Sequence, residues 1–206
     1  MTSTAGVILA GGQSRRMGGG DKCLADLGNA TLLARVQARL HPQVAQLALN
    51  ANGDPQRFAQ TGLKVIPDTI AGFAGPLAGV LAGLDWAAAI GATRVVTVAA
   101  DTPFFPTDLV ARLEEALSAQ YPIVLAATKK PGEAPSRQPT CAVWPTACRE
   151  ALRASLRDGV RKVVAFTDAI GCTSVNFSAA PFDPFFNVNT PEDMQKAAAL
   201  MKEFDL

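Results

Sequence analysis

The sequence has few of the residues that build thiolate metal centres or histidine-dependent catalytic sites. It contains four cysteines, none of them in a CxxC pair, and a single histidine, His41. This spacing excludes a zinc finger, and one histidine argues against a Ser-His-Asp or Cys-His catalytic site. We interpret the cysteines as reduced thiols of a cytosolic protein. His41 precedes Pro42 at an apparent helix end, so we expect it at the surface.

Long apolar runs and an excess of charge of one sign are also missing. The first apolar stretch, residues 7–10, is too short for a membrane span or for the core of a signal peptide, and no basic segment precedes it. Nineteen basic residues stand against 18 acidic ones, for a net charge of +1. Such a balance gives no support for bulk binding to nucleic acid or to an anionic membrane. We therefore expect a cytoplasmic protein with neither partner, and the balance still allows a local basic site.

What is present is the pattern of an ordered α/β protein. Hydrophobic residues make up 49% and charged residues 18% of the 206 positions, which is typical of a globular chain. Strand and helix signals alternate up to about residue 128. Apolar runs predict strands at residues 6–10, 46–50, 63–66, 94–100 and 123–127, and helices are predicted at 31–40, from Pro55, at 76–90 and at 107–119. This order predicts a mostly parallel sheet with helices on both faces, a three-layer sandwich.

The last third of the chain is less regular. A polar loop is expected at residues 129–136, strands at 140–144 and 173–177, and helices at 146–156 and 159–169. A final helix should begin after Thr190, because a hydroxyl cap is followed by proline and two carboxylates. There is no internal repeat and no long linker. The sequence therefore predicts one domain over residues 1–206.

A glycine-rich segment follows the first predicted strand. Five of the ten residues 11–20 are glycine, and Arg15, Arg16 and Lys22 lie within or just after this run. Bare backbone N–H groups and cations at the carboxyl end of a parallel strand are typical of a polyphosphate site. The spacing is not GxGxxG, since Gly11 is followed directly by Gly12. It is not a P-loop either, since Asp21 separates Gly20 from Lys22 and no serine or threonine follows the lysine. The structural alternative is a flexible turn with solvated charges.

Two carboxylates follow other predicted strands. Asp101 ends the most β-branched strand, and at the carboxyl end of a central strand it would face the same crevice as the glycine-rich run. Triphosphates arrive with Mg²⁺, which is usually held by one or two carboxylates and the phosphates. Asp101 is therefore a candidate magnesium ligand, or else it only caps the turn before Pro103. Asp68 ends another strand and is a second candidate for metal, base or sugar, or a turn residue.

These motifs together resemble a known family. The stretch Leu9-Ala-Gly-Gly, continued by Arg16-Met-Gly and Asp21-Lys22, is similar to the signature of Rossmann-like, GT-A-type nucleotidyltransferases. Further segments narrow the resemblance to the molybdenum cofactor guanylyltransferase (MobA) family: Asn-Ala-Asn at 50–52, Val-Ile-Pro-Asp at 65–68, Gly-Pro-Leu-Ala-Gly at 75–79, Asp-Thr-Pro at 101–103 and Phe-Asn-Val-Asn-Thr-Pro-Glu-Asp at 186–193. The resemblance covers residues 7 to about 195. It implies transfer of GMP from GTP to molybdopterin or Mo-molybdopterin, with release of pyrophosphate.

The resemblance also implies roles for individual residues. It places Leu9, Ala10 and Gly11 on the guanine and ribose, Arg16, Gly19 and Lys22 on the phosphates, and Asn50 and Asp68 on the nucleotide. It places Asp101 on Mg²⁺. On the acceptor side, it places Asn187 and Asn189 near the pterin and Arg161 or Lys162 near the acceptor phosphate. Residues 1–128 would then form the nucleotide-binding half and 129–206 the acceptor-side half. Transient contacts with molybdenum cofactor biosynthesis proteins and molybdoenzyme chaperones are implied as well. The chain departs from the family pattern at Gly53, Ala99-Ala100 and Gln138, where arginine, Pro-Cys and histidine are familiar.

The expected chemistry does not need a histidine. The acceptor phosphate is already ionised, so catalysis would consist of in-line positioning and charge neutralisation by Mg²⁺, Lys22 and Arg16. Two alternatives remain open. One is a related enzyme such as a CTP:molybdopterin cytidylyltransferase, although those enzymes tend to have alanine where Gly11 stands. The other is a non-catalytic nucleotide-binding protein, against which the presence of both Lys22 and Asp101 argues.

Overall fold

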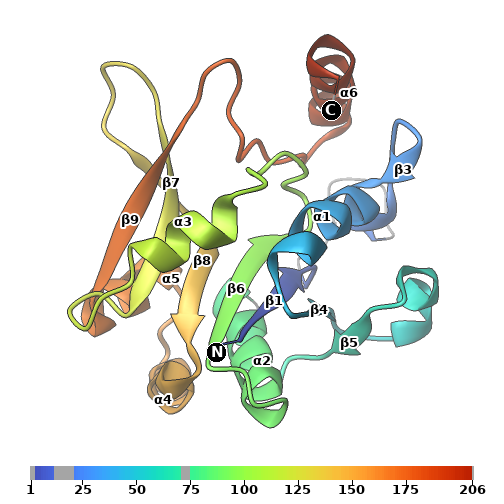
Figure 1. Cartoon of the computed structure of the whole chain (residues 1–206). Coiled ribbons are helices and arrows are strands. Elements are labelled where there is room, and N and C mark those ends of the chain that lie inside the picture. The colour runs from blue at the N-terminus through green and yellow to red at the C-terminus, as the bar shows by residue number, and fades with distance from the viewer. Residues whose placement is uncertain (1–2, 12–20, 71–74, 206) are drawn as a thin grey trace.

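A seven-stranded sheet forms the centre of the computed structural model, which describes residues 3–11, 21–70 and 75–205. The strand order is β5-β4-β1-β6-β8-β7-β9 (Figure 1). The strands are β1 (Thr4–Leu9), β4 (Gln46–Asn50), β5 (Lys64–Ile66), β6 (Arg94–Ala99), β7 (Ile123–Lys129), β8 (Ser136–Pro145) and β9 (Cys172–Ser178). β8 runs antiparallel to both of its neighbours, whereas the other pairs are parallel. The predicted α/β fold with a mostly parallel sheet is confirmed.

Helices cover both faces of this sheet (Figure 1). One face packs against α1 (Leu32–Leu40) and α3 (Leu109–Glu115), and the other against α2 (Pro76–Ala89), α4 (Arg149–Arg157) and α5 (Val163–Ile170). Neighbouring strand residues alternate between the two cores: Val95 belongs to the α2 side and Val96 to the α1 side. Because both faces are buried, the central strands are mostly apolar and appear in the sequence as short apolar runs, and the buried Thr97 hydroxyl in β6 accepts a hydrogen bond from the Trp144 indole N–H.

A third, smaller core fixes the C-terminal helix α6 (Pro191–Phe204) near the carboxyl ends of the central strands. Its buried members are Leu27, Leu32, Phe104, Val188 and Ala197. Thr190 caps α6 as predicted: its side chain accepts a hydrogen bond from the Asp193 N–H, and Asp193 bonds back to the Thr190 N–H. The cap and the buried Val188 hold the segment just before α6 in place.

Several predicted boundaries are wrong in detail. α3 begins at Leu109 rather than at 107, and it ends at Glu115. In its first turn the Val110 N–H donates a hydrogen bond to the Gln43 side chain. Residues 159–162 are not helical, since Gly159 takes a positive φ of 90° after α4. The loop expected at 129–136 is shorter, because β8 already begins at Ser136. A hairpin of β2 (Asp26–Leu27) and β3 (Ala30–Thr31) was not predicted, and the element after Asp54 is a 3-10 helix over Pro55–Thr61.

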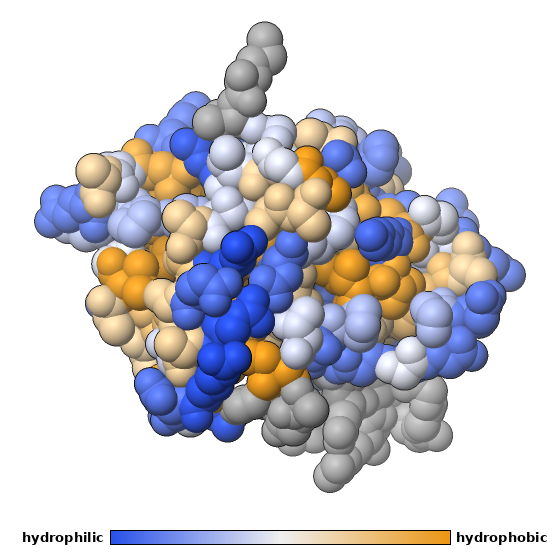
Figure 2. Space-filling view, turned by 90° about the horizontal axis from the view of Figure 1, so that it is seen from below, coloured by the Kyte–Doolittle hydropathy of each residue, from blue (hydrophilic) through white to orange (hydrophobic). Residues whose placement is uncertain are grey.

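The cysteines and the single histidine have the state and position that the sequence predicts for them. All four cysteines are free thiols, and burial raises the pKa of Cys23 to about 11 and those of Cys141 and Cys148 to about 12. His41 is exposed at the end of α1. Within the described ranges, Tyr121 is the one large apolar side chain that is exposed, and Figure 2 shows hydrophilic and apolar residues interspersed over one face. None of the described helices has the length and apolar character needed to span a membrane.

Candidate active site

The predicted site residues gather at the carboxyl ends of four parallel strands. Leu9 ends β1 and pairs in register with Asn50 at the end of β4 and with Ala99 at the end of β6. The backbone continues this pairing beyond the strands, since the Ala10 N–H donates to the Asn50 carbonyl at 2.9 Å and the Ala100 N–H to the Leu9 carbonyl at 3.0 Å. The parallel register therefore places Leu9, Ala10 and Gly11 beside Asn50 and next to the strand that leads to Asp101.

One side of the site is an amide–carboxylate cluster. The Asn50 amide donates to Oδ1 of Asp68 at 3.0 Å and to the Ile66 carbonyl at 3.1 Å. The Asn52 amide donates to the second oxygen of Asp68 at 2.8 Å, and its own oxygen accepts from the Asp68 N–H at 2.9 Å. Asn50 is only 2% exposed, so this network is held from below by the core. Both oxygens of Asp68 are thereby oriented while the side chain keeps partial exposure.

The first turn of α2 closes over this cluster because Gly79 has no side chain. A Cβ atom at Gly79 would lie 2.2 Å from Oδ1 of Asn50, far inside van der Waals contact. At Gly11, which is exposed, a Cβ atom would lie 3.6 Å from the same oxygen, an ordinary contact. Gly79 therefore permits a close approach of helix and amide that any other residue would prevent.

The other side of the site is built around Lys22. Its Nζ atom lies 2.5 Å from Oδ2 of Asp101 and 2.8 Å from Oδ1 of Asn189. The Lys22 and Asp101 side chains are 17% and 23% exposed, so the pair borders solvent without being surrounded by it. Lys22 and Asn189 are separated by 167 positions in the sequence. The structure thus brings together three of the residues for which the sequence predicted separate roles.

The segment before α6 is fastened to the end of β6. The Val188 N–H donates to the Asp101 carbonyl at 2.9 Å, and the Thr102 hydroxyl donates to Oδ1 of Asn187 at 2.6 Å. Val188 is fully buried, whereas Asn187 and Asn189 are exposed. This is the alternation expected of an extended backbone. Both amide oxygens are engaged within the protein, but the two NH₂ groups make no hydrogen bond in the described part of the chain.

Sequence reasoning missed the contribution of Arg57. Its Nη1 lies 2.6 and 2.5 Å from the two carboxylate oxygens of Asp21, and its Nη2 donates to the Asn52 carbonyl at 2.5 Å. Arg57 therefore connects Asp21, the residue directly before Lys22, with Asn52, which orients Asp68. No sequence pattern links positions 36 residues apart in this way. Asn52, by contrast, was detectable, because residues i and i+2 of an extended chain point to the same side.

Some predicted residues are not brought to this site or cannot be placed. Arg16 and Gly19 lie outside the described residues. Arg161 donates to the carbonyls of Leu156 and Val160, and Lys162 is the exposed residue before α5. Neither of these two is seen in contact with Asn187 or Asn189. Their predicted role on the acceptor phosphate therefore stays a prediction.

The donor set around Asp101 fits a magnesium ion. No group of three or more His, Cys, Asp or Glu side chains gathers anywhere in the described ranges, so a closed all-protein metal cage is absent from them. What is present is the partly exposed Asp101 carboxylate, whose Oδ2 contacts the Lys22 ammonium together with the amide oxygen of Asn189. Mg²⁺ prefers oxygen ligands and is commonly held by one or two carboxylates together with substrate phosphates and waters. Zinc would instead require a set of nitrogen or sulfur ligands that these residues do not offer.

Comparison with known proteins finds a matching family model and relatives that are about one-half identical. Residues 6–170 match the model of the MobA-like NTP transferase domain. The chain is 50% identical over 203 residues to a molybdenum cofactor guanylyltransferase of Mesorhizobium japonicum, with 96% of each chain covered. It is 49% identical to a protein of the same name from Bradyrhizobium sp., with 97% of this chain and 93% of the relative covered.

Solved structures show the same fold at much lower identity. Molybdopterin-guanine dinucleotide biosynthesis protein A from Archaeoglobus fulgidus superposes with a TM-score of 0.72 at 22% identity, over 97% of this chain and 99% of the other. A 4-diphosphocytidyl-2C-methyl-D-erythritol synthase from Anaerococcus prevotii gives a TM-score of 0.75 at 13% identity, over 98% and 96%. The fold is therefore shared by proteins that carry different names.

The close approach at Gly79 generates a first prediction. Gly79→Ala should lower thermal stability, because overpacking costs about 1–3 kcal/mol, more than the gain of up to about 1 kcal/mol from higher helix propensity. Gly83→Ala is the matched control, since its Cβ would meet Val7 Cγ2 at 2.9 Å, an aliphatic contact away from Asn50. Only Gly79→Ala should shift the NMR signals of the Asn50 side-chain amide. Unchanged Asn50 signals together with full stability would contradict the close approach.

Proposed function

The chain belongs to the MobA-like NTP transferase family, and from that premise we propose that it transfers GMP from GTP to molybdopterin, releasing pyrophosphate and forming the guanine dinucleotide form of the cofactor. It is an enzyme, a nucleotidyltransferase. The observation that carries the proposal is the identity of about one half, over nearly the whole chain, with relatives named molybdenum cofactor guanylyltransferase. The acceptor is molybdopterin or its molybdenum-bearing form.

We propose that the nucleoside binds along the backbone of Leu9, Ala10 and Gly11, beside Asn50 and Asp68. Gly11 is exposed and has no side chain, so a ligand can approach its backbone closely. An ionised carboxylate can only accept hydrogen bonds, so the oriented oxygens of Asp68 suit the ribose hydroxyls or the N–H edge of guanine. Asn50 and Asn52 act as positioning residues that keep this carboxylate aimed.

Lys22 and Arg16 are proposed to bind the triphosphate. The Lys22 ammonium is positioned in advance by Asp101 and Asn189, which belong to different segments. A preset cation costs little reorganisation when charge moves onto the leaving pyrophosphate. Arg57 holds the carboxylate of Asp21, the residue directly before Lys22. Arg16 is proposed for the same task from the sequence alone.

Mg²⁺ is proposed as the cofactor, with Asp101 as its protein ligand. The ion would neutralise charge on the phosphates as pyrophosphate leaves. Asp101 is held by the Val188 N–H at its backbone and by Lys22 at its side chain, so its carboxylate is fixed at the end of β6. The attacking oxygen belongs to an acceptor phosphate that is already ionised. The residues of this chain therefore need to orient two phosphates in line and to shield their repulsion, and no general base is required.

The acceptor is proposed to bind in the half formed by residues 129–206, with residues 1–128 as the nucleotide half. Asn187 and Asn189 present their NH₂ groups, and these are donors that suit the acceptor atoms at the edge of a pterin. Arg161 or Lys162 would supply positive charge for the acceptor phosphate. We place the reaction in the cytoplasm, where free thiols stay reduced. Transient contacts with molybdenum cofactor biosynthesis proteins and molybdoenzyme chaperones complete the proposal.

Pyrophosphate release tests this function. The full chain is incubated with GTP, CTP or ATP, each with and without molybdopterin, in the presence of Mg²⁺ or of EDTA. We expect release only with GTP, molybdopterin and Mg²⁺ together. Release with CTP instead would establish a cytidylyl transferase. Nucleotide binding without release under any condition would establish a binding protein.

Asp101→Asn should lower turnover by at least about a hundredfold, because it keeps the shape but removes the charge of a main electrostatic stabiliser. The matched control is Asp108→Asn, which removes the same charge from an exposed residue whose side chain makes no capping bond to α3. Steady-state rates over a range of Mg²⁺ concentrations decide the matter. A variant with nearly normal turnover would show that Asp101 only shapes the turn after β6.

Asn187→Ala should raise the KM for the acceptor by about tenfold, the value of one lost hydrogen bond, and should leave the Kd of GTP unchanged. Asn176→Ala, at an exposed position on β9, is the control. Calorimetry with GTP and kinetics with varied molybdopterin separate the two ligands. A lower melting temperature with normal kinetics would mean that Asn187 only ties the segment to Thr102. Weaker GTP binding with normal acceptor kinetics would overturn the division into two halves.

A further inference from the structure

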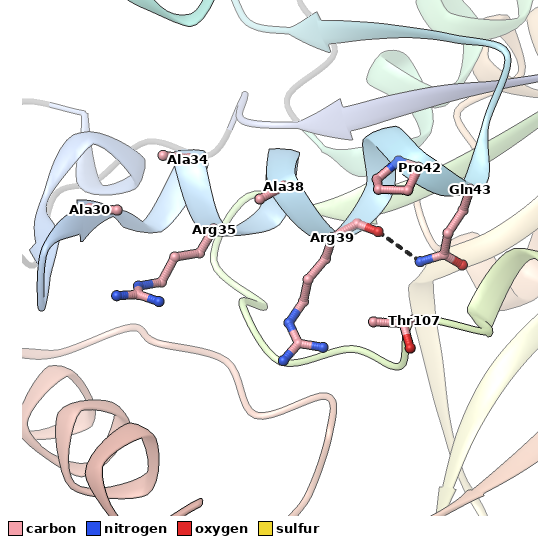
Figure 3. A pocket seen from close by; sticks show the side chains of 8 residues that line it. All are labelled: Ala30, Ala34, Arg35, Ala38, Arg39, Pro42, Gln43 and Thr107. Carbon is pink, nitrogen blue, oxygen red and sulfur yellow. Dashed lines mark hydrogen bonds between the residues drawn. The ribbon is translucent and has the colours of Figure 1, made fainter. Parts of the chain in front are cut away.

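A pocket of about 380 Å³ lies beside α1, away from the residues assigned to the transferase site. Figure 3 shows its lining, which comes from β3, from α1, from the short turn that follows α1 and from the connection after β6. The lining residues are Ala30, Ala34, Arg35, Ala38, Arg39, Pro42, Gln43 and Thr107. None of them belongs to the amide–carboxylate cluster or to the Lys22 cluster. The pocket therefore needs an explanation of its own.

Two arginines one helical turn apart extend from α1 toward the same side of this pocket (Figure 3). Arg35 donates to the Leu27 carbonyl at 2.8 Å and to Oδ1 of Asn29 at 2.9 Å, and Arg39 donates to the Phe105 carbonyl at 3.1 Å. All three acceptors are neutral. Among the described residues no carboxylate pairs with either guanidinium, whereas five other arginines form ion pairs.

The arrangement is unfavourable for the protein alone. Like charges four residues apart on a helix repel each other. Burial lowers the pKa of Arg39, and the neighbouring charge of Arg35 lowers it further. Burial lowers the pKa of Arg35 as well. Both guanidiniums nevertheless stay protonated at neutral pH, because their ordinary pKa is so high. Unfavourable local arrangements, such as this pair of like charges on one helix face, occur most often at functional sites.

The groups that face the pocket define what it can bind. Gln43 is fully engaged: its NH₂ group donates to the carbonyls of Arg39 and Pro106, and its oxygen accepts from Val110. The unused polar groups are the remaining guanidinium N–H donors and the exposed hydroxyl of Thr107. The alanines and Pro42 supply an aliphatic wall. A ligand must therefore bring acceptor oxygens, negative charge and a small apolar part.

We propose that this pocket binds the phosphate group of a small phosphorylated metabolite, at a site separate from that of the nucleotide. Two guanidiniums match the double negative charge of a phosphate monoester better than the single charge of a carboxylate, and each planar fork can hold two oxygens. The volume is in the range of small-molecule sites rather than of protein interfaces. An occupant would join α1, the β2–β3 hairpin through Arg35 and the connection after β6 through Arg39.

NMR of the arginine side chains tests the proposal. The full chain, in buffer free of phosphate and at constant ionic strength set with chloride, is titrated separately with inorganic phosphate, sulfate and acetate. We expect saturable shifts of the Arg35 and Arg39 Nε–H signals with the two dianions and none with acetate. The Lys22→Ala variant should show the same phosphate titration of these two signals, because Lys22 lies in the other site.

Variants and melting temperatures complete the test. Arg39→Gln should weaken phosphate binding at least about tenfold, the loss expected for a charge-assisted hydrogen bond. Arg137→Gln, which removes an exposed arginine paired with Asp168, should leave it unchanged. Without phosphate, Arg39→Gln should melt only slightly lower than the wild type, because the hydrogen bond to the Phe105 carbonyl is lost while a small repulsion is relieved. Phosphate should then stabilise the wild type and not the variant.

Three outcomes would overturn the proposal. Shifts that do not saturate would show that the two arginines attract anions only by general electrostatics and do not form a binding site. Acetate binding as tightly as phosphate would point to a carboxylate, such as an acidic side chain of another protein. A large loss of stability in phosphate-free Arg39→Gln, with the phosphate response retained, would show that Arg39 only ties the connection after β6 to α1.

Discussion

The parallel pairing of β1 with β4 and β6 is the constraint on which the rest of the site depends. The register sets Leu9 opposite both Asn50 and Ala99, so three strands end at the same level. The residues that directly follow β1, β4 and β6 therefore lie next to one another. The asparagine, the two aspartates and the first residues of the glycine-rich segment meet there, although they are far apart in the sequence. A shift of one residue in this register would turn each of these side chains toward the opposite face.

Side-chain pairs then fix what the backbone has brought together. Asp68 is oriented by two amides, and Lys22 is oriented by Asp101 and Asn189. Arg57 links the two groups, because it contacts both Asp21 and the Asn52 carbonyl. A site arranged in advance spends little binding energy on ordering its own groups. This suits phosphoryl chemistry, in which the protein mainly positions charges and forms no covalent intermediate.

The same reliance on positioned charge explains why the candidate site contains neither histidine nor cysteine. The one histidine lies exposed at the end of α1 and takes no part in the site, and the three most buried thiols have raised pKa values that keep them protonated. An ionised phosphate as acceptor makes both kinds of residue unnecessary. The arginine pair on α1 is the opposite case, since it carries charge that the described residues leave without a carboxylate. The two features together suggest that charge in this protein is placed mainly for phosphate groups.

The sequence by itself determines the sheet and the local parts of the site. Apolar runs predict the central strands and amphipathic stretches the helices, because a strand buried on both faces has few polar positions. Gly11, Asp68 and Asp101 are detectable because each lies at the end of a strand signal, and Lys22 because it follows the glycine-rich run after the first strand. The direction of β8 is not detectable, since an apolar run looks the same in either direction. Only the tertiary structure decides that Lys22 meets Asn189, that Arg57 holds Asp21 and that Arg35 and Arg39 share a pocket. The first two contacts join residues 167 and 36 positions apart, and periodicity carries no information about which distant side chains will meet.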